Sequence, residues 1–200
     1  IETMVVLMQD ITELRQVQEQ LRLQNLHLEQ IRIELERQKH QLEEKNRDIM
    51  ESIGYARRIQ EALIPGEEEL ERFFSESFVI HWLRDVVGGD FYWCGEVADQ
   101  VVVAVVDCTG HGVPGAFMTF LGYTLLEAAV RDQHLLDPAQ ILYFMDRRLR
   151  QLLAGQEAVQ DGMDVALCVV DRKRQLVRFA GAHRPLLLYQ NGRWSLLGGA

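Results

Sequence analysis

Three aspartates stand at the ends of apolar, strand-like runs, where a side chain is readily presented to a ligand. Asp90 opens one run after two glycines, Asp107 closes a second, and Asp164 directly precedes a third. Hard divalent cations such as Mg²⁺ and Mn²⁺ prefer carboxylate, carbonyl and water oxygens as ligands. The pattern therefore predicts either a divalent-cation site or isolated surface acids. Asp107 alone is also compatible with capping the helix that follows it.

Two other motifs offer competing chemistry. The segment GGDF at residues 88–91 resembles part of the diguanylate cyclase signature. However, the Glu expected between Asp and Phe is absent, as is the nucleotide-binding segment that this family carries upstream. Cys108 and His111 have the C-x₂-H spacing of a soft-metal ligand pair, whereas zinc sites usually contain two such pairs. Further zinc ligands would have to come from Cys94, Cys168 and His183.

The elements that would position these groups are strands around a pair of consecutive helices. This order indicates an α+β fold in which helices cover a sheet, and not an alternating parallel sheet. The longest apolar stretch, 113–130, contains a proline, two glycines and Glu127, which predicts a buried helix and not a membrane span. The expected strands are 78–83, 90–97, 101–107, 163–170, 175–180 and 185–189, and the expected helices are 114–132 and 138–153.

Residues 14–56 contain a heptad repeat with a leucine-rich row and a second, partly polar row. With no Gly or Pro before Gly54, the repeat predicts a parallel homodimeric coiled coil that weakens toward its C-terminal end. In such a pair Glu34 would reach the partner's Lys39. The alternative is a single amphipathic helix lying on the globular domain. The first row is Leu14, Leu21, Leu28, Leu35, Leu42 and Ile49, and the polar members of the second are Gln24, Gln38, Lys45 and Ser52.

The chain divides into four expected segments. Its opening contains a strand-like run at 4–8 followed by Asp-Ile-Thr, and resembles the junction between a PAS sensor domain and a signalling helix. Pro65 ends the helical region, because the residue before a proline is disfavoured in the α conformation. The segments are a PAS-like tail (1–13), a coiled-coil signalling helix (14–56), a switch helix and linker (57–66) and a globular domain (67–200).

Charge and cysteine content indicate which partners and which cellular compartment are expected. The net charge of −9 argues against nucleic-acid binding, because no basic face offsets it. Three cysteines without a CxxC motif indicate a reducing compartment, so a cytoplasmic location is expected. The opening residues do not have the pattern of a signal peptide, and no direct membrane contact is expected in this segment. Membrane segments upstream in a longer parent chain lie outside this prediction.

Five motifs occur in an order that resembles the sporulation-protein-E-type serine phosphatases. This family is a bacterial branch of the metal-dependent, type 2C-like protein phosphatases. The resemblance covers residues 55–200 and implies an α-β-β-α sandwich of two antiparallel sheets flanked by helices. The motifs are IQ to LIP at 59–65, VGGDFY at 87–92, VDCTGHGVPGA at 106–116, DGMD at 161–164 and AGAHRPL at 180–186.

The resemblance also implies a site and an activity. Asp90 and Asp107 would bind a pair of Mn²⁺ or Mg²⁺ ions, the backbone carbonyl of Cys108 would contribute to one ion, and Asp164 would be the third carboxylate. His111 is either a general acid for the leaving group or a structural residue at the start of the next helix. The implied substrate is phosphoserine or phosphothreonine on a small regulatory protein, typically an anti-sigma-factor antagonist.

The sequence departs from the family pattern at its C-terminal end. The family normally has a further metal-binding Asp in a TDG-like segment, and the sequence stops at Ala200 before such a segment. We therefore expect a truncated domain with an incomplete site that binds metal weakly, and an exposed sheet edge. The alternative function is a non-catalytic dimerisation and phosphoprotein-binding module.

Overall fold

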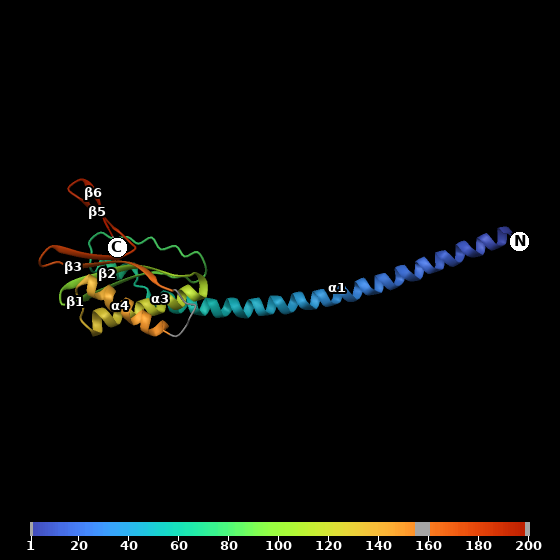
Figure 1. Cartoon of the computed structure of the whole chain (residues 1–200), viewed down its shortest axis with the longest axis horizontal. Coiled ribbons are helices and arrows are strands. Elements are labelled where there is room, and N and C mark those ends of the chain that lie inside the picture. Colours follow the sequence, from blue (N-terminus) through green and yellow to red (C-terminus); the bar gives the residue numbers. More distant parts are fainter. Residues whose placement is uncertain (1, 155–160, 199–200) are drawn as a thin grey trace. The chain divides into compact units, whose positions relative to one another are not determined.

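The computed structural model describes residues 2–154 and 161–198, and the chain divides between Ser52 and Ile53 into two compact units. All the described strands belong to the second unit (Figure 1). In chain order the elements are α1 (Glu2–Leu63), α2 (Glu67–Glu71), β1 (Asp90–Val97), β2 (Gln100–Cys108), α3 (Gly112–Glu127), the π-helical turn η1 (Ala128–Asp132), α4 (Pro138–Leu153), β3 (Met163–Asp171), β4 (Leu176–Ala182), β5 (Leu186–Gln190) and β6 (Arg193–Leu197).

The first unit is the N-terminal part of α1, whose apolar seam faces solvent in the single chain. Leu14 and Leu35 are 66% and 63% exposed. An unburied apolar row on a helix is typical of a helix that pairs with a partner, and the coiled-coil dimer stays a prediction. Glu34 accepts hydrogen bonds from Arg37 of the same helix, at 2.8 and 2.9 Å. Its expected contact with the partner's Lys39 also stays a prediction.

The predictions for the two ends of α1 have different outcomes. The run 4–8, expected as a strand, lies inside the helix, so that expectation is wrong. A strand needs a neighbour for its N–H and C=O groups, whereas a helix satisfies these groups within itself. The interpretation of 1–13 as a PAS-like tail stays a prediction. At its other end α1 stops at Leu63, just before Pro65, which confirms the predicted end of the helix.

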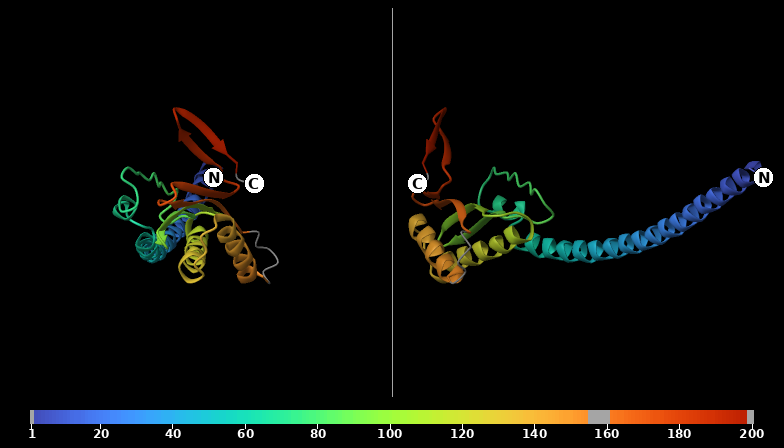
Figure 2. Two further views of the ribbon diagram at one scale, coloured as in Figure 1. Left: turned by 90° about the vertical axis from the view of Figure 1, so that its left-hand side faces the viewer. Right: turned by 45° about the vertical axis from the view of Figure 1, so that its right-hand side comes forward.

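The second unit is built on an antiparallel sheet in the order β1-β2-β3-β4. Helices α3 and α4 lie on one face of this sheet (Figure 2). Successive residues of a strand point to opposite faces, and in β2 the residues Val102, Ala104 and Val106 are almost completely buried in the core on the helix side. The core therefore lies between the sheet and the two helices.

The helices of this core follow the sequence expectation. By length and composition 112–132 is the one described helix that would be able to span a membrane, but Leu126 and Ala129 within it are fully buried in the domain core. This is the buried helix that its proline, glycines and Glu127 predicted. Helix α4 has a capped N-terminus, because Asp137 accepts a hydrogen bond from the backbone N–H of Gln140 at 3.1 Å.

The face of the sheet away from α3 and α4 is partly open. Val105 in β2 and Val177 in β4 are 58% and 53% exposed. A groove of about 1000 Å³ runs over this face, between the loop that contains residues 76–82 and strand β5. Its lining is mainly apolar, and Asp90 and Asp107 are among the lining residues.

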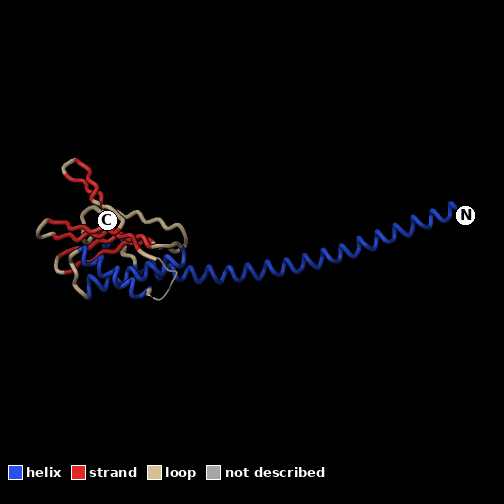
Figure 3. Tube along the Cα trace, viewed as in Figure 1, coloured by secondary structure: helices blue, strands red, loops and turns tan. Residues whose placement is uncertain are grey.

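The chain between α2 and β1 is a long loop (Figure 3), and the strand expected at 78–83 does not form. The segment is almost entirely apolar, yet Phe78, Ile80 and Trp82 in it are exposed. The expectation was wrong because strand-like composition alone does not make a strand. Within the described residues no neighbouring strand pairs with this segment, and an extended chain requires such a partner.

Strands β5 and β6 form a separate two-stranded sheet (Figure 2). Asn191 and Gly192 join them with positive φ angles of 53° and 74°, the conformation that a tight two-residue hairpin turn requires. The remaining strand and helix predictions hold, with ends shifted by two residues or fewer. The observed fold is the expected α+β arrangement of two antiparallel sheets with helices, preceded by a long N-terminal helix.

Candidate metal centre

Asp90, Asp107 and Asp164 lie side by side on three neighbouring strands. In the antiparallel register Asp90 is opposite Asp107, and Asp107 is opposite Asp164. Residues directly opposite each other project on the same side of a sheet. We call these three residues the aspartate row. The row lies on the face away from the helices, because Val106 and Cys108 on either side of Asp107 point into the helix-side core.

The first two members of the aspartate row interact directly. Burial raises the pKa of Asp90, and a hydrogen bond to Asp107 together with the negative charge of that residue raises it further. The nearby His81 and Arg184 act in the opposite direction. Two carboxylates this close stay ionised together only when a positive charge offsets their repulsion. The pair therefore favours a proton or a cation.

Arg184 supplies positive charge at the other side of the row. Its guanidinium contacts the carboxylate of Asp107, and its Nε lies 3.5 Å from Oδ2 of Asp164. Arg184 lies inside the AGAHRPL motif, but no role was expected for it from the sequence. The available signal was a basic residue just after a strand, in a motif expected to lie near three acids.

Gln60 links the end of α1 to the segment that begins β1. The residue is 1% exposed, and its side-chain amide makes two hydrogen bonds to the backbone of Gly88. Gln60 Nε2 donates to the Gly88 carbonyl at 2.6 Å, and the Gly88 N–H donates to Gln60 Oε1 at 3.2 Å. The hydroxyl of Thr119 in α3 donates to the same carbonyl at 2.9 Å. Two helices thus fix the backbone two residues before Asp90.

Thr109 fixes the start of β3 in a similar way. Its N–H donates to the carbonyl of Gly162 at 3.0 Å, and its hydroxyl accepts from the N–H of Gly162 at 3.0 Å. These contacts join the loop after Asp107 to the segment that leads into Asp164. The DGMD and DCTG motifs of the sequence therefore meet at one end of the sheet.

The carbonyl of Cys108 lies next to the glycine that precedes Asp90. A Cβ added to Gly89 would lie 2.9 Å from the carbonyl oxygens of both Cys108 and Gly110. Glycine is required there because any side chain would displace these backbone groups. Ligation of a metal by the Cys108 carbonyl stays a prediction, but this oxygen lies close to the beginning of the row.

The Cys108 thiol is unsuited to soft-metal ligation. It is buried in the helix-side core, and burial, with smaller contributions from Asp107 and Asp90, raises its pKa to about 12. Burial similarly raises the pKa of Cys94 to about 11 and raises that of Cys168. Zinc binding requires the thiolate, so these environments disfavour the zinc alternative.

This environment predicts slow thiol chemistry. At pH 8 we expect the native protein to react with a disulfide reagent such as DTNB at least about tenfold more slowly than the same protein in guanidinium chloride, because the thiolate is the reacting form. Release of thionitrobenzoate measures both rates. Rapid stoichiometric labelling of Cys108 in the folded protein, identified by peptide mapping, would contradict its burial.

His111 occupies the N-cap position of α3, at the end of the DCTGH motif. Its Nδ1 lies 2.8 Å from Oδ2 of Asp85, in the loop before β1. Within the described residues no hydrogen bond or ion pair joins His111 to the aspartate row. Its contacts fit the structural alternative, and its role as general acid stays a prediction.

The donor set of the row suits a hard cation. Carboxylates and nearby carbonyls are the oxygen ligands that Mn²⁺ and Mg²⁺ prefer. In the part of the chain that the structure describes, no three His, Cys, Asp or Glu side chains are grouped closely enough to enclose an ion. Instead the Arg184 guanidinium lies against Asp107 and Asp164. The row thus has the oxygen ligands of a divalent-cation site, and the positively charged side chain of Arg184 lies next to them.

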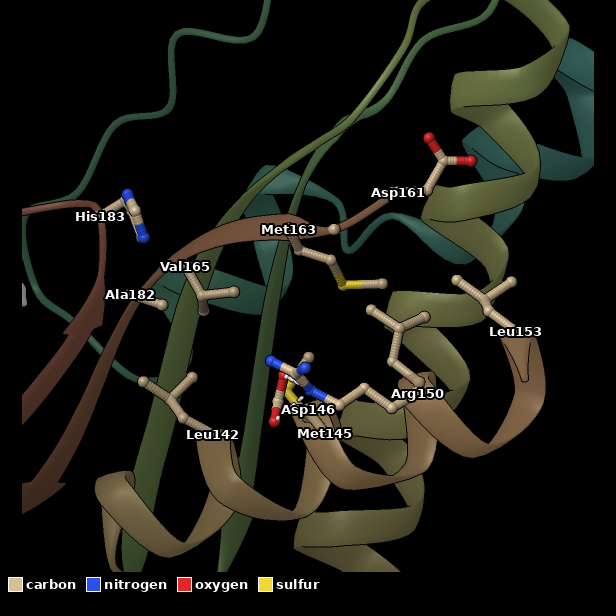
Figure 4. Close-up of a pocket in the computed structure, with 12 residues that line it drawn as sticks. Leu142, Met145, Asp146, Arg150, Leu153, Asp161, Met163, Val165, Ala182 and His183 are labelled. Atoms are coloured by element: carbon tan, nitrogen blue, oxygen red, sulfur yellow. Dashed lines mark hydrogen bonds and ion pairs between the residues drawn. The ribbon is translucent and has the colours of Figure 1, made fainter. Parts of the chain in front are cut away.

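A second cavity, of about 540 Å³, lies on the other face of the sheet between α4 and strands β3 and β4 (Figure 4). Leu142 and Met145 line it from α4, opposite Val165 and Ala182. An ion pair between Asp146 and Arg150 lies on its α4 side. None of the three row aspartates lines this cavity. It is therefore not the candidate metal site.

The order of motifs and the sheet architecture agree with comparisons to known proteins. Residues 98–199, half of the chain, match the family described as Stage II sporulation protein E (SpoIIE). The chain belongs to the SpoIIE family. Its structure is similar to the SiaA-PP2C domain of Pseudomonas aeruginosa, with a TM-score of 0.70 and 40% sequence identity. No match is found among curated proteins.

The structural match covers 78% of this SpoIIE-family chain and 62% of the SiaA chain, so the sequence spans less than two thirds of that structure. The two comparisons identify a phosphatase domain of the SpoIIE/PP2C type. The expected family and fold class are thereby confirmed. The metal ligands, the substrate and the dimer stay predictions.

Proposed function

We propose that this SpoIIE-family chain carries the catalytic domain of a metal-dependent protein serine/threonine phosphatase. The observation that supports this proposal most strongly is the aspartate row, in which three carboxylates are held in register and two of them, Asp90 and Asp107, line an open groove. Asp90, Asp107 and Asp164 would hold the ions, with the Cys108 carbonyl beside them. Two bound Mn²⁺ or Mg²⁺ ions would supply an acidified water and offset the charge of the phosphoryl oxygens.

The groove supports a protein substrate. It is mainly apolar, about 1000 Å³ in volume, and Asp90, Asp107 and Arg184 are among its lining residues. A segment of a protein carrying phosphoserine or phosphothreonine would place its phosphate near these charged residues and its apolar side chains against the apolar lining. By family resemblance the substrate is a small regulatory protein such as an anti-sigma-factor antagonist, encountered in the cytoplasm.

The direct test is release of phosphate from a phosphoserine protein as Mn²⁺ is added. We expect release that depends on Mn²⁺, is removed by a chelator, and is competed by a phosphoserine peptide. Binding of the phosphoprotein without turnover at any Mn²⁺ concentration would instead support the non-catalytic binding module.

We also propose that α1 regulates this activity as a parallel dimer that responds to an upstream sensor. The polar seam positions Gln38, Lys45 and Ser52 precede Gln60, which contacts the backbone before Asp90. A change in how this seam packs would move Gln60, and with it the beginning of the aspartate row.

Replacing Gln38, Lys45 and Ser52 together by leucine is expected to stabilise the dimer and to change phosphatase activity severalfold. Sedimentation measures the dimer and phosphate release measures the activity. The matched control replaces the exposed Gln30, Arg37 and Glu44, which lie off the predicted seam, by alanine. A tighter dimer with unchanged activity would show that seam packing and the site are not coupled.

A further inference from the structure

Arg184 is held against the aspartate row by the backbone that carries it. It follows β4 through His183, which adopts a left-handed conformation with φ of 57° and forms a bridge to Val165 of β3. Residues other than glycine seldom adopt this conformation. The turn at His183 therefore fixes where Arg184 leaves the sheet, and the guanidinium reaches Asp107 and Asp164 from there.

Arg184 is the principal positive charge of the row. Among the described residues no other Lys or Arg forms an ion pair with Asp90, Asp107 or Asp164. An arginine stays charged at all physiological pH values, so losing a proton cannot remove it from the site. Its contacts involve Oδ2 of both Asp107 and Asp164. These are the carboxylates that the proposed function assigns to divalent ions.

We infer that Arg184 is an exchangeable counter-cation of the aspartate row. It neutralises Asp107 and Asp164 when the row holds no divalent ion, and it leaves them when such an ion binds. The inference rests on the proposed metal-dependent function. A guanidinium and a divalent ion repel each other, and both require the same carboxylate oxygens, so the two positive charges cannot occupy them together. Arg184 thereby lowers the affinity of the row for Mn²⁺ and stabilises the metal-free domain.

The test compares Arg184→Met, which keeps the length of the side chain without its charge, with Arg184→Lys. The control is Arg150→Met, which removes a guanidinium from Asp146 on α4, away from the row. Calorimetric titration measures Mn²⁺ affinity, and thermal unfolding with chelator measures the metal-free protein. For Arg184→Met we expect Mn²⁺ to bind about three- to tenfold more tightly, because two half-exposed ion pairs no longer compete.

The same variant should melt about 2–4 °C lower without metal, since Asp107 and Asp164 lose their counter-cation, and added Mn²⁺ should reverse this loss. Arg184→Lys should lie between wild type and Arg184→Met, because lysine keeps the charge but not the two-point contact. Arg150→Met should leave Mn²⁺ affinity unchanged. Unchanged or weaker Mn²⁺ binding by Arg184→Met would overturn the exchange.

An Asp107→Asn variant in the same titration separates this inference from the proposed function. Mn²⁺ binding that Asp107→Asn abolishes but Arg184→Met leaves unchanged would refute the exchange and leave the metal site standing. Absence of Mn²⁺ binding in both wild type and Arg184→Met would refute both. A gain in affinity for Arg184→Met without any phosphate release would support the exchange and count against the phosphatase.

Discussion

Replacing Asp107 by asparagine is expected to lower Mn²⁺-dependent phosphate release by at least about 100-fold, which is the upper end of what loss of a residue that only supports a metal ligand causes. Asp107 is the central member of the aspartate row, opposite both Asp90 and Asp164. Asparagine keeps the size of the side chain and one oxygen but loses the negative charge. The variant should therefore fold and fail to assemble the site.

The matched control for Asp107→Asn is Asp146→Asn. Both aspartates pair with an arginine, Asp107 with Arg184 and Asp146 with Arg150, but Asp146 lies on α4 away from the row. The control should retain activity within about twofold of wild type, because surface substitutions away from a site have small effects. If both variants release phosphate at the wild-type rate, the assignment of the row as the catalytic centre is wrong.

Replacing Gln60 by leucine should destabilise the domain by about 2–3 kcal/mol. Leucine fits the volume but removes both hydrogen bonds to Gly88, and it leaves the buried N–H of that residue without a partner. The Gly88 carbonyl keeps its hydrogen bond from Thr119. The freed segment leads directly into Asp90, so Mn²⁺ affinity should also fall, by about 10–100-fold, as for other residues that position metal ligands.

Urea unfolding measures the loss of stability, and Mn²⁺ titration measures the change at the site. The control is Gln140→Leu, a glutamine on the exposed side of α4, which should change the free energy of unfolding by no more than about 0.5 kcal/mol. A Gln60→Leu protein as stable as wild type would mean that the contact with Gly88 contributes nothing net. Lower stability with unchanged Mn²⁺ affinity would show that the end of α1 supports the fold but not the site.

Local patterns were sufficient to predict much of the fold. The strand-like run 90–97 and the apolar run that ends at Asp107 correspond to β1 and β2, and Pro65 correctly indicated where α1 ends. The failures at 4–8 and 78–83 have a common cause. Both segments have strand-like composition, but whether a strand forms depends on a neighbour that composition does not reveal.

For the site too, local sequence patterns predicted some features, whereas features that depend on contacts distant in the sequence were not predicted. Asp90, Asp107 and Asp164 were identifiable because each follows or precedes an apolar run, but their alignment depends on strand register, which was not predicted. Gln60 lacked a local signal of function, and the signal at Arg184 was only a basic residue just after a strand. Gln60 contacts a residue far away in the sequence, and Arg184 reaches across two strands after the turn at His183.

The register of β1, β2 and β3 also restricts which insertions and deletions the protein can tolerate. Because side chains alternate between faces, deleting one residue from β2 ahead of Asp107 would turn Asp107 toward the core and place Cys108 in the row. The hairpin between β5 and β6 has no comparable restriction, since its turn lies outside the four-stranded sheet. In a library of single-codon insertions and deletions, we expect functional variants to include length changes near Asn191. We expect no functional variant with a length change between Asp90 and Asp107.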